Sequence, residues 1–80
     1  MDINTEVIKI ITATKNLYVP VKESSDLYRD LDFDSLEFIQ LIIKIEETYS
    51  INFDLLEMDQ CLQVGRLIKA VEHKLEVAGT

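Results

Sequence analysis

Residues 35–49 carry more apolar surface than one face of a helix can hold, and this excess limits the folds open to the chain. At about 100° per residue, one set of side chains falls on a single face that suits burial against other helices. That set is Phe38, Leu41, Ile42, Ile45 and Tyr49. A second apolar line, rotated away from the first, consists of Leu36, Ile39 and Ile43 and is called the apolar ridge below. We therefore expect an amphipathic helix with additional apolar surface outside its core-facing stripe.

The first 34 residues divide into a periodic and a non-periodic part. In residues 3–17, large apolar side chains recur at near-helical spacing, and Asp2 or Asn4 is suited to cap the start of a first helix. In residues 18–34 this spacing is lost, because Pro20 blocks helix continuation and a Ser-Ser-Asp sequence favours turns. We expect a first helix followed by a long loop, and connections of this length are often functional.

Two further signals complete the secondary structure. Asp54 and Glu57 have the spacing of a capping box, which predicts a third helix of one or two turns. From Val64 onward, apolar residues at i, i+3, i+4, i+7 and i+11 predict an amphipathic last helix that frays near Gly79. No segment carries a strand signal. We therefore expect a single domain over residues 1–80 with an all-α fold, an antiparallel four-helix bundle of three main helices and a short third one.

The charge of the chain restricts its partners. The 80 residues carry a net charge of −7, so nucleic acid would be repelled and basic protein surfaces would be attracted. No stretch approaches the roughly 18 consecutive apolar residues of a membrane span, and the N-terminus lacks the pattern of a signal peptide. We expect a monomer in the cytoplasm that binds neither nucleic acid nor membranes. The single cysteine, Cys61, is expected to pack as a small apolar side chain.

Ser35 is the most informative polar residue, because it begins the helix predicted for residues 35–49. Asp34 is placed to act as the N-cap, and Glu37 lies three residues later, which is an acidic version of the capping box. At the first helical position, free backbone N–H groups and the positive end of the helix dipole would stabilise a phosphodiester on the Ser35 hydroxyl. Attachment of a phosphate group is therefore the chemistry that this position supports.

Catalysis and metal binding are both disfavoured. A nucleophilic serine needs an oriented base, and the one histidine, His73, lies among charged residues of the last helix. Asp30, Asp32 and Asp34 match positions 1, 3 and 5 of an EF-hand loop, but position 6 is not glycine and position 12 is not glutamate. We expect no catalytic site and no metal site. An acidic helical interaction module without a prosthetic group stays open as an alternative.

The apolar ridge has two explanations. It could pack under the loop of residues 18–34, or it could be a docking surface beside Ser35 for an enzyme with a basic patch. Acidic residues around the ridge favour docking. These are Glu37, Glu46 and Glu47.

Several motifs together give the chain a family resemblance. It resembles an acyl carrier or peptidyl carrier protein in its size, its acidity and its long first loop. The signature Leu-x-x-Asp-Ser-Leu of such carriers is present at Leu31, Asp34, Ser35 and Leu36. The resemblance covers essentially the whole chain and includes residues 25–31, 46–49 and 64–67.

This resemblance implies that Ser35 accepts 4'-phosphopantetheine from coenzyme A through a phosphopantetheinyl transferase, with Asp34 beside it as part of the site. The thiol of the arm would hold acyl or aminoacyl cargo as a thioester, so the chain would be a carrier and no enzyme. Its partners would be loading, condensing or tailoring enzymes with basic docking patches. The positions where such carriers meet their enzymes match Leu36, Glu37, Ile39, Ile43 and Glu47.

Departures from the family pattern bear on the pathway. Asp32 stands where glycine is usual, and Gln63 replaces a good N-cap before the last helix. Gln40 and Lys44 lie on a helix face that is commonly more acidic in carriers of fatty-acid synthesis. We therefore expect a discrete carrier of polyketide or nonribosomal peptide biosynthesis, with type II fatty-acid synthesis as the alternative. A D-alanyl or other aminoacyl cargo also stays open.

Overall fold

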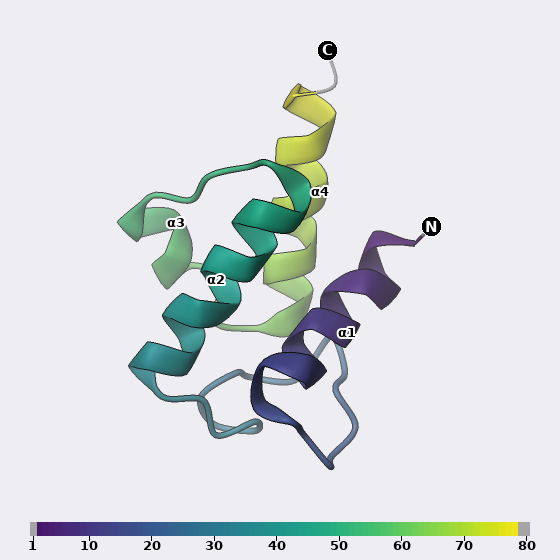
Figure 1. Cartoon of the computed structure of the whole chain (residues 1–80), viewed down its shortest axis with the longest axis vertical. Helices are drawn as coiled ribbons and strands as arrows, with labels where there is room; N and C mark the ends of the chain where they lie inside the picture. Colours follow the sequence, from purple (N-terminus) through teal and green to yellow (C-terminus); the bar gives the residue numbers. More distant parts are fainter. Residues whose placement is uncertain (1, 79–80) are drawn as a thin grey trace.

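The computed structural model describes residues 2–78, and over this range the chain forms four helices (Figure 1). They are α1 (Ile3–Lys15), α2 (Ser35–Tyr49), α3 (Leu55–Asp59) and α4 (Val64–Ala78). α1 packs against α2 and α4 and runs opposite to both of them. The short α3 lies on the side of α2 away from α1 (Figure 1). The predicted all-α bundle of three main helices and a short third one is confirmed.

The ends of α1 are set by an aspartate and an asparagine. Asp2 is the N-cap, because its carboxylate accepts a hydrogen bond from the Asn4 backbone N–H at 3.3 Å. The helix ends at Lys15, two residues before the predicted end. Asn16 adopts a left-handed conformation with φ of 53°, and its N–H donates to the Thr12 carbonyl. Asparagine tolerates this conformation well, so it ends the helix although Leu17 continues the apolar pattern.

The core lies between α1, α2 and α4 and is made of aliphatic side chains. Its fully buried members include Val7, Ile11, Leu41, Ile45, Val64, Leu67 and Val71. Four of the five stripe residues predicted on α2 are buried, and Tyr49 is half-buried. The Tyr49 hydroxyl donates to Glu6 Oε1 at 2.8 Å. Burial, followed by this hydrogen bond and the charge of Glu6, raises the pKa of Tyr49.

The long loop between α1 and α2 is anchored to the rest of the protein. Leu27, Leu31 and Phe33 are buried in the core. The backbone N–H of Leu27 also donates to the Leu62 carbonyl at 2.8 Å, which ties the loop to the segment between α3 and α4. The loop therefore has a fixed path up to the start of α2.

This loop also supplies the cap of α4. The N–H of Val64 donates to the Ser25 carbonyl at 3.0 Å, and that of Gly65 donates to the Glu23 carbonyl at 2.8 Å. These bonds satisfy N–H groups that a capping side chain would otherwise satisfy, so Gln63 does not weaken the start of α4. A Cβ atom on Gly65 would lie 3.0 Å from the Glu23 carbonyl oxygen, which is a tight contact, so this close approach favours glycine.

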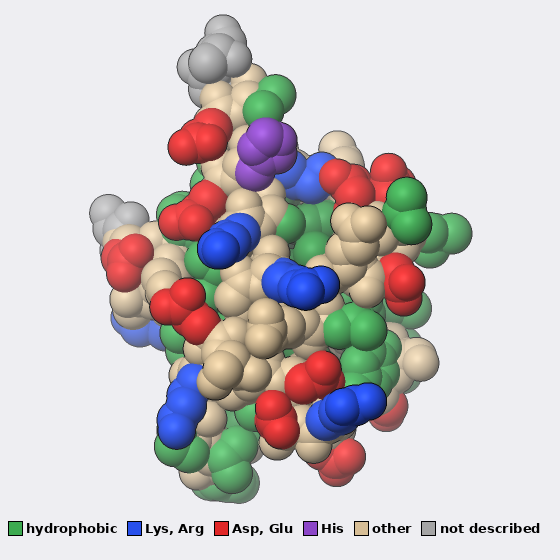
Figure 2. Space-filling view, turned by 180° about the vertical axis from the view of Figure 1, so that it is seen from behind, with side chains coloured by type: hydrophobic (Ala, Val, Ile, Leu, Met, Phe, Trp, Pro, Cys, Tyr) green, Lys and Arg blue, Asp and Glu red, His purple; other side chains and the backbone are tan. Residues whose placement is uncertain are grey.

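The face of the molecule over α4 is polar. Figure 2 shows acidic and basic side chains interspersed there, together with the exposed histidine, His73. No helix within residues 2–78 is both long and apolar enough to cross a lipid bilayer.

Candidate functional site

The loop meets α2 at Asp34, and a complete capping box fixes this junction. Asp34 Oδ1 accepts from the Glu37 N–H at 2.8 Å, and Glu37 Oε1 accepts from the Asp34 N–H at 2.9 Å. Both halves of the predicted box are present. The helix therefore begins at Ser35, and Ser35 is exposed.

Two backbone donors remain free beside the Ser35 hydroxyl. A helix leaves its first four N–H groups without intrahelical acceptors. In α2 the capping box satisfies those of Asp34 and Glu37, whereas those of Ser35 and Leu36 have no acceptor within residues 2–78. These donors lie at the positive end of the helix dipole, where negative charge is stabilised. The position therefore fits the phosphate end of a phosphopantetheine group.

Lys15, in the last turn of α1, connects α1 to the loop and to α2. Its Nζ donates to the carbonyl of Asp32 and to Glu37 Oε1, the latter at 3.1 Å. The same ammonium group lies 5.5 Å from the centre of the Phe33 ring. Sequence reasoning missed this residue, because its partners are 17 and 22 positions away along the chain. Lys15 thus holds the segment on both sides of Ser35.

Asp32 occupies a backbone conformation that explains the usual glycine. Its φ is 57°, in the left-handed region that favours glycine. Aspartate is among the residues that tolerate this region. With aspartate at position 32 the loop can therefore follow the same path as with glycine, but with some backbone strain.

A hollow of about 340 Å³ opens beside Ser35. The residues that line it come from the loop, α2, α3 and the segment after α3: Tyr28, Ser35, Phe38, Ile39, Leu55, Met58, Asp59 and Leu62. The rings of Tyr28 and Phe38 pack together with their centres 5.8 Å apart. Apolar side chains dominate this lining, so the hollow offers apolar surface directly beside the serine.

The apolar ridge is exposed to solvent and is not covered by the loop. Leu36 is 64% exposed, Ile39 44% and Ile43 48%. Of the two explanations, packing under residues 18–34 is therefore wrong. Exposed apolar side chains in a line are typical of interaction surfaces.

The three glutamates predicted around the ridge differ in their availability. Glu37 is bound by Asp34 and Lys15, and Glu46 Oε2 accepts from the Phe53 N–H at 2.8 Å. Both are half-buried. Glu47 is exposed and has no partner within residues 2–78. Glu47 is therefore the one of the three whose charge is free for another protein.

Two leucines of α3 add apolar surface that sequence reasoning assigned to no site. Leu55 is 84% exposed and Leu56 69%. A capping box between Asp54 and Glu57 places them in the first turn of α3. Leu55 lines the hollow beside Ser35 together with Ile39. Adjacent leucines between Asp54 and Glu57, inside the predicted capping box, were the signal available in the sequence.

Other groups with possible chemistry lie elsewhere. Cys61 is buried, as expected, and burial, followed by the negative charge of Glu57, raises the pKa of its thiol to about 11. The Asp30 carboxylate accepts from the Asp26 N–H at 2.7 Å. Within the described range, no three His, Cys, Asp or Glu side chains are grouped so that they could hold a metal ion.

Comparison with known proteins agrees with this geometry. The model of the phosphopantetheine attachment site family matches residues 10–71, a range that includes Ser35 and the apolar ridge. Over 54 residues the chain is 35% identical to the acyl carrier protein of Chlamydia muridarum. The aligned region covers 68% of this chain and 70% of that protein.

A solved structure is similar in fold. It is a Mycobacterium tuberculosis protein provisionally assigned as an acyl carrier protein, with a TM-score of 0.85 and 22% identity. The similarity covers 90% of this chain and 97% of that one. Between a carrier and an acidic helical interaction module, the family match decides for the carrier. The chain belongs to the phosphopantetheine attachment site family, as an acyl carrier protein that carries acyl groups on covalently attached 4'-phosphopantetheine.

Proposed function

We propose that Ser35 is the residue that carries the 4'-phosphopantetheine arm. The observation that supports it is the exposed position of Ser35 at the start of α2, beside the free N–H groups of Ser35 and Leu36. Asp34 serves this site as a positioning residue, because its carboxylate fixes the helix start through the Glu37 N–H. Because Asp34 fixes the helix start, Ser35→Ala should leave the fold intact.

The modification is a phosphoryl transfer from coenzyme A. The Ser35 Oγ forms a bond to the phosphorus that bears the pantetheine, and the bond from that phosphorus to the departing adenosine bisphosphate breaks. The serine proton passes to a base supplied by the phosphopantetheinyl transferase. When attached, the arm supplies a thiol that holds the acyl group as a thioester. Reactions of that thioester are catalysed by partner enzymes. Between these reactions, the hollow lined by Tyr28, Phe38 and Leu55 shields apolar cargo from water.

Partner enzymes dock on the apolar ridge and on Glu47. The ridge provides exposed apolar area, and Glu47 provides a free negative charge for a basic patch. Leu55 extends the apolar surface across the hollow onto α3. Glu37 and Glu46 support this surface from within, through their hydrogen bonds to the loop and to Phe53.

The pathway is that of a specialised metabolite, polyketide or nonribosomal peptide, and the carrier works there as a cytoplasmic monomer. The support is the charge of α2 beside the ridge, where Gln40 and Lys44 are exposed in place of acidic residues. A partner of primary fatty-acid synthesis that presents only basic residues would meet Lys44 unfavourably. Type II fatty-acid synthesis is the alternative, and a D-alanyl or other aminoacyl load is another.

Intact mass tests the attachment site. The chain is incubated with coenzyme A, magnesium and a promiscuous phosphopantetheinyl transferase. We expect a mass increase of one phosphopantetheine group in the natural chain, none in Ser35→Ala, and the full increase in Ser24→Ala, which removes another exposed serine. An increase that persists in Ser35→Ala contradicts the site.

The pathway requires a different measurement. The loaded carrier is purified from its native cell, and the group on the thioester is released and weighed. A polyketide intermediate or an amino acid built into a peptide supports the proposal. A series of saturated fatty acyl chains contradicts it and favours the alternative.

A further inference from the structure

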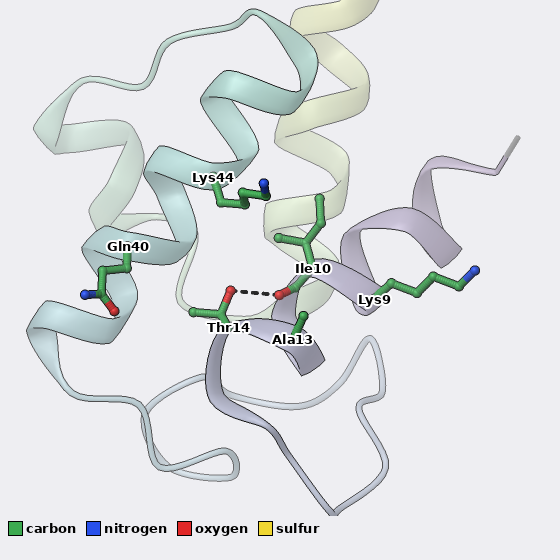
Figure 3. A pocket seen from close by; sticks show the side chains of 6 residues that line it. All are labelled: Lys9, Ile10, Ala13, Thr14, Gln40 and Lys44. Atoms are coloured by element: carbon green, nitrogen blue, oxygen red, sulfur yellow. Dashed lines mark hydrogen bonds between the residues drawn. The ribbon is translucent and has the colours of Figure 1, made fainter.

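The outer face of α1 is bordered by two hollows that lie away from Ser35. One, of about 430 Å³, lies between α1 and α2 and is called the α1–α2 groove here. Its lining, drawn in Figure 3, consists of Lys9, Ile10, Ala13, Thr14, Gln40 and Lys44. The other, of about 420 Å³, shares Lys9 and Ala13 with the groove and continues past the end of α1 to Leu17 and Tyr18.

The groove combines an apolar floor with two lysines, of which Lys9 extends away from α2 (Figure 3). Ile10 and Ala13 face it from α1, and Lys44 reaches toward it from α2 (Figure 3). The Thr14 hydroxyl already donates to the Ile10 carbonyl at 2.7 Å, so its proton is not available to a ligand. Tyr18, at the far end of the neighbouring hollow, is 99% exposed. Exposed tyrosines are frequent anchors in protein interfaces.

The charge of this face is opposite to that of the chain. The chain has 15 acidic and 8 basic residues, yet no residue lining either hollow is acidic. Lys15 and Lys74 bind carboxylates at 3.1 and 2.7 Å, whereas Lys9 and Lys44 have no carboxylate partner within residues 2–78. Two unneutralised ammonium groups beside apolar surface are complementary to an acidic, amphipathic ligand.

We propose that the α1–α2 groove docks an acidic amphipathic helix of a partner protein. Such a helix places apolar side chains on Ile10 and Ala13 and carboxylates near Lys9 and Lys44, which is the helix-in-groove mode of recognition. A free lipid fits less well, because Ala13 and Gln40 are exposed and its chain would stay partly in water. The groove borders the apolar ridge, since Gln40 and Lys44 directly follow Ile39 and Ile43 on α2. The proposal does not depend on modification of Ser35.

A peptide titration followed by NMR tests this proposal. The probe is a synthetic amphipathic helix of leucine and glutamate, added to the isotope-labelled chain at physiological salt. A second peptide with lysine for every glutamate is the control probe. We expect the acidic peptide to shift the amide signals of Ile10, Ala13 and Lys44, and the basic peptide to leave them unchanged.

Two double variants with the same change of net charge separate local from general electrostatics. Lys9→Glu/Lys44→Glu should weaken binding of the acidic peptide by about tenfold. Arg66→Glu/Lys69→Glu, which alters exposed residues of α4, should change the affinity by less than about twofold.

Three results would overturn the proposal. One is an acidic peptide that leaves the groove signals unchanged, and another is equal weakening by both double variants. The third is a concentration-dependent shift of the groove signals without peptide, which would assign the groove to a second copy of this chain.

Discussion

Replacement of Lys15 by methionine should destabilise the protein more than replacement of any exposed lysine. Methionine keeps most of the aliphatic stem and removes the ammonium group. The variant loses hydrogen bonds to the Asp32 carbonyl and to Glu37 Oε1, and it loses the contact with the Phe33 ring. Glu37 and Lys15 are both largely shielded from water, with side chains 28% and 22% exposed. We expect a loss of about 2 kcal/mol in the free energy of unfolding.

Thermal and urea unfolding followed by circular dichroism measure this loss. For a domain of this size, 2 kcal/mol corresponds to a fall in Tm of about 8–16 °C. Lys69→Met is the matched control, because it also removes one positive charge but alters an exposed residue without an ion pair in the described part of α4. It should change the stability by less than about 0.5 kcal/mol.

The same variant should slow the modification proposed for Ser35. The segment from Asp32 to Glu37 loses its attachment to α1, so Ser35 is presented less rigidly to the transferase, and kcat/KM should fall even below the melting temperature. Lys15→Arg should recover part of the stability, since it restores the charge. If Lys15→Met and Lys69→Met have the same Tm, the contacts of Lys15 do not hold this segment, contrary to the prediction.

Three further predictions concern single positions. Ile39→Asp should impair turnover by partner enzymes with little loss of stability. The control Ile42→Asp, at a buried position, should unfold the chain. If both variants unfold, Ile39 belongs to the core. Asp32→Gly should raise stability by about 0.5–1 kcal/mol in urea titrations, because φ there is 57°, and a loss would contradict the strain. Burial keeps the Cys61 thiol protonated in the folded state up to about pH 11, whereas in the unfolded state it ionises near its ordinary pKa of 9.0. The contribution of the buried thiol to the free energy of unfolding is therefore complete below pH 9 and declines from there toward pH 11. In a Ser35→Ala background, the stability difference between the cysteine and Cys61→Ala should therefore narrow over that range, and a constant difference would exclude the effect.

The helix starts could be predicted because their signals are local. Asp34 with Glu37, and Asp54 with Glu57, lie within four residues of each other, so the spacing alone locates both capping boxes. The end of α1 was predicted two residues too late, because Leu17 continues the apolar spacing and the left-handed conformation of Asn16 ends the helix.

The parts of the site that depend on distant residues could not be predicted. Nothing near Lys15 in the sequence indicates that it binds Asp32 and Glu37. The start of α4 looked weak because Gln63 is a poor cap, and the carbonyls that replace the cap belong to a loop about 40 residues earlier. Exposure of the ridge depends likewise on the path of that loop, so the sequence left two explanations where the fold leaves one.

The availability of the glutamates shows the same limit. Periodicity places Glu37, Glu46 and Glu47 around the ridge, but it does not show which carboxylates already have partners. Glu37 accepts a hydrogen bond within the capping box, and Glu46 accepts one from the Phe53 N–H in the segment after α2. Only the three-dimensional structure separates Glu47 from them.

Tandem mass spectrometry of the carrier from its native cell shows which residue bears the phosphopantetheine group. The protein is digested, and the peptide that bears the phosphopantetheine group is fragmented to locate the modified residue. We expect one group, on Ser35. A group on Ser24, Ser25 or Ser50, or a native protein without any group, would contradict it.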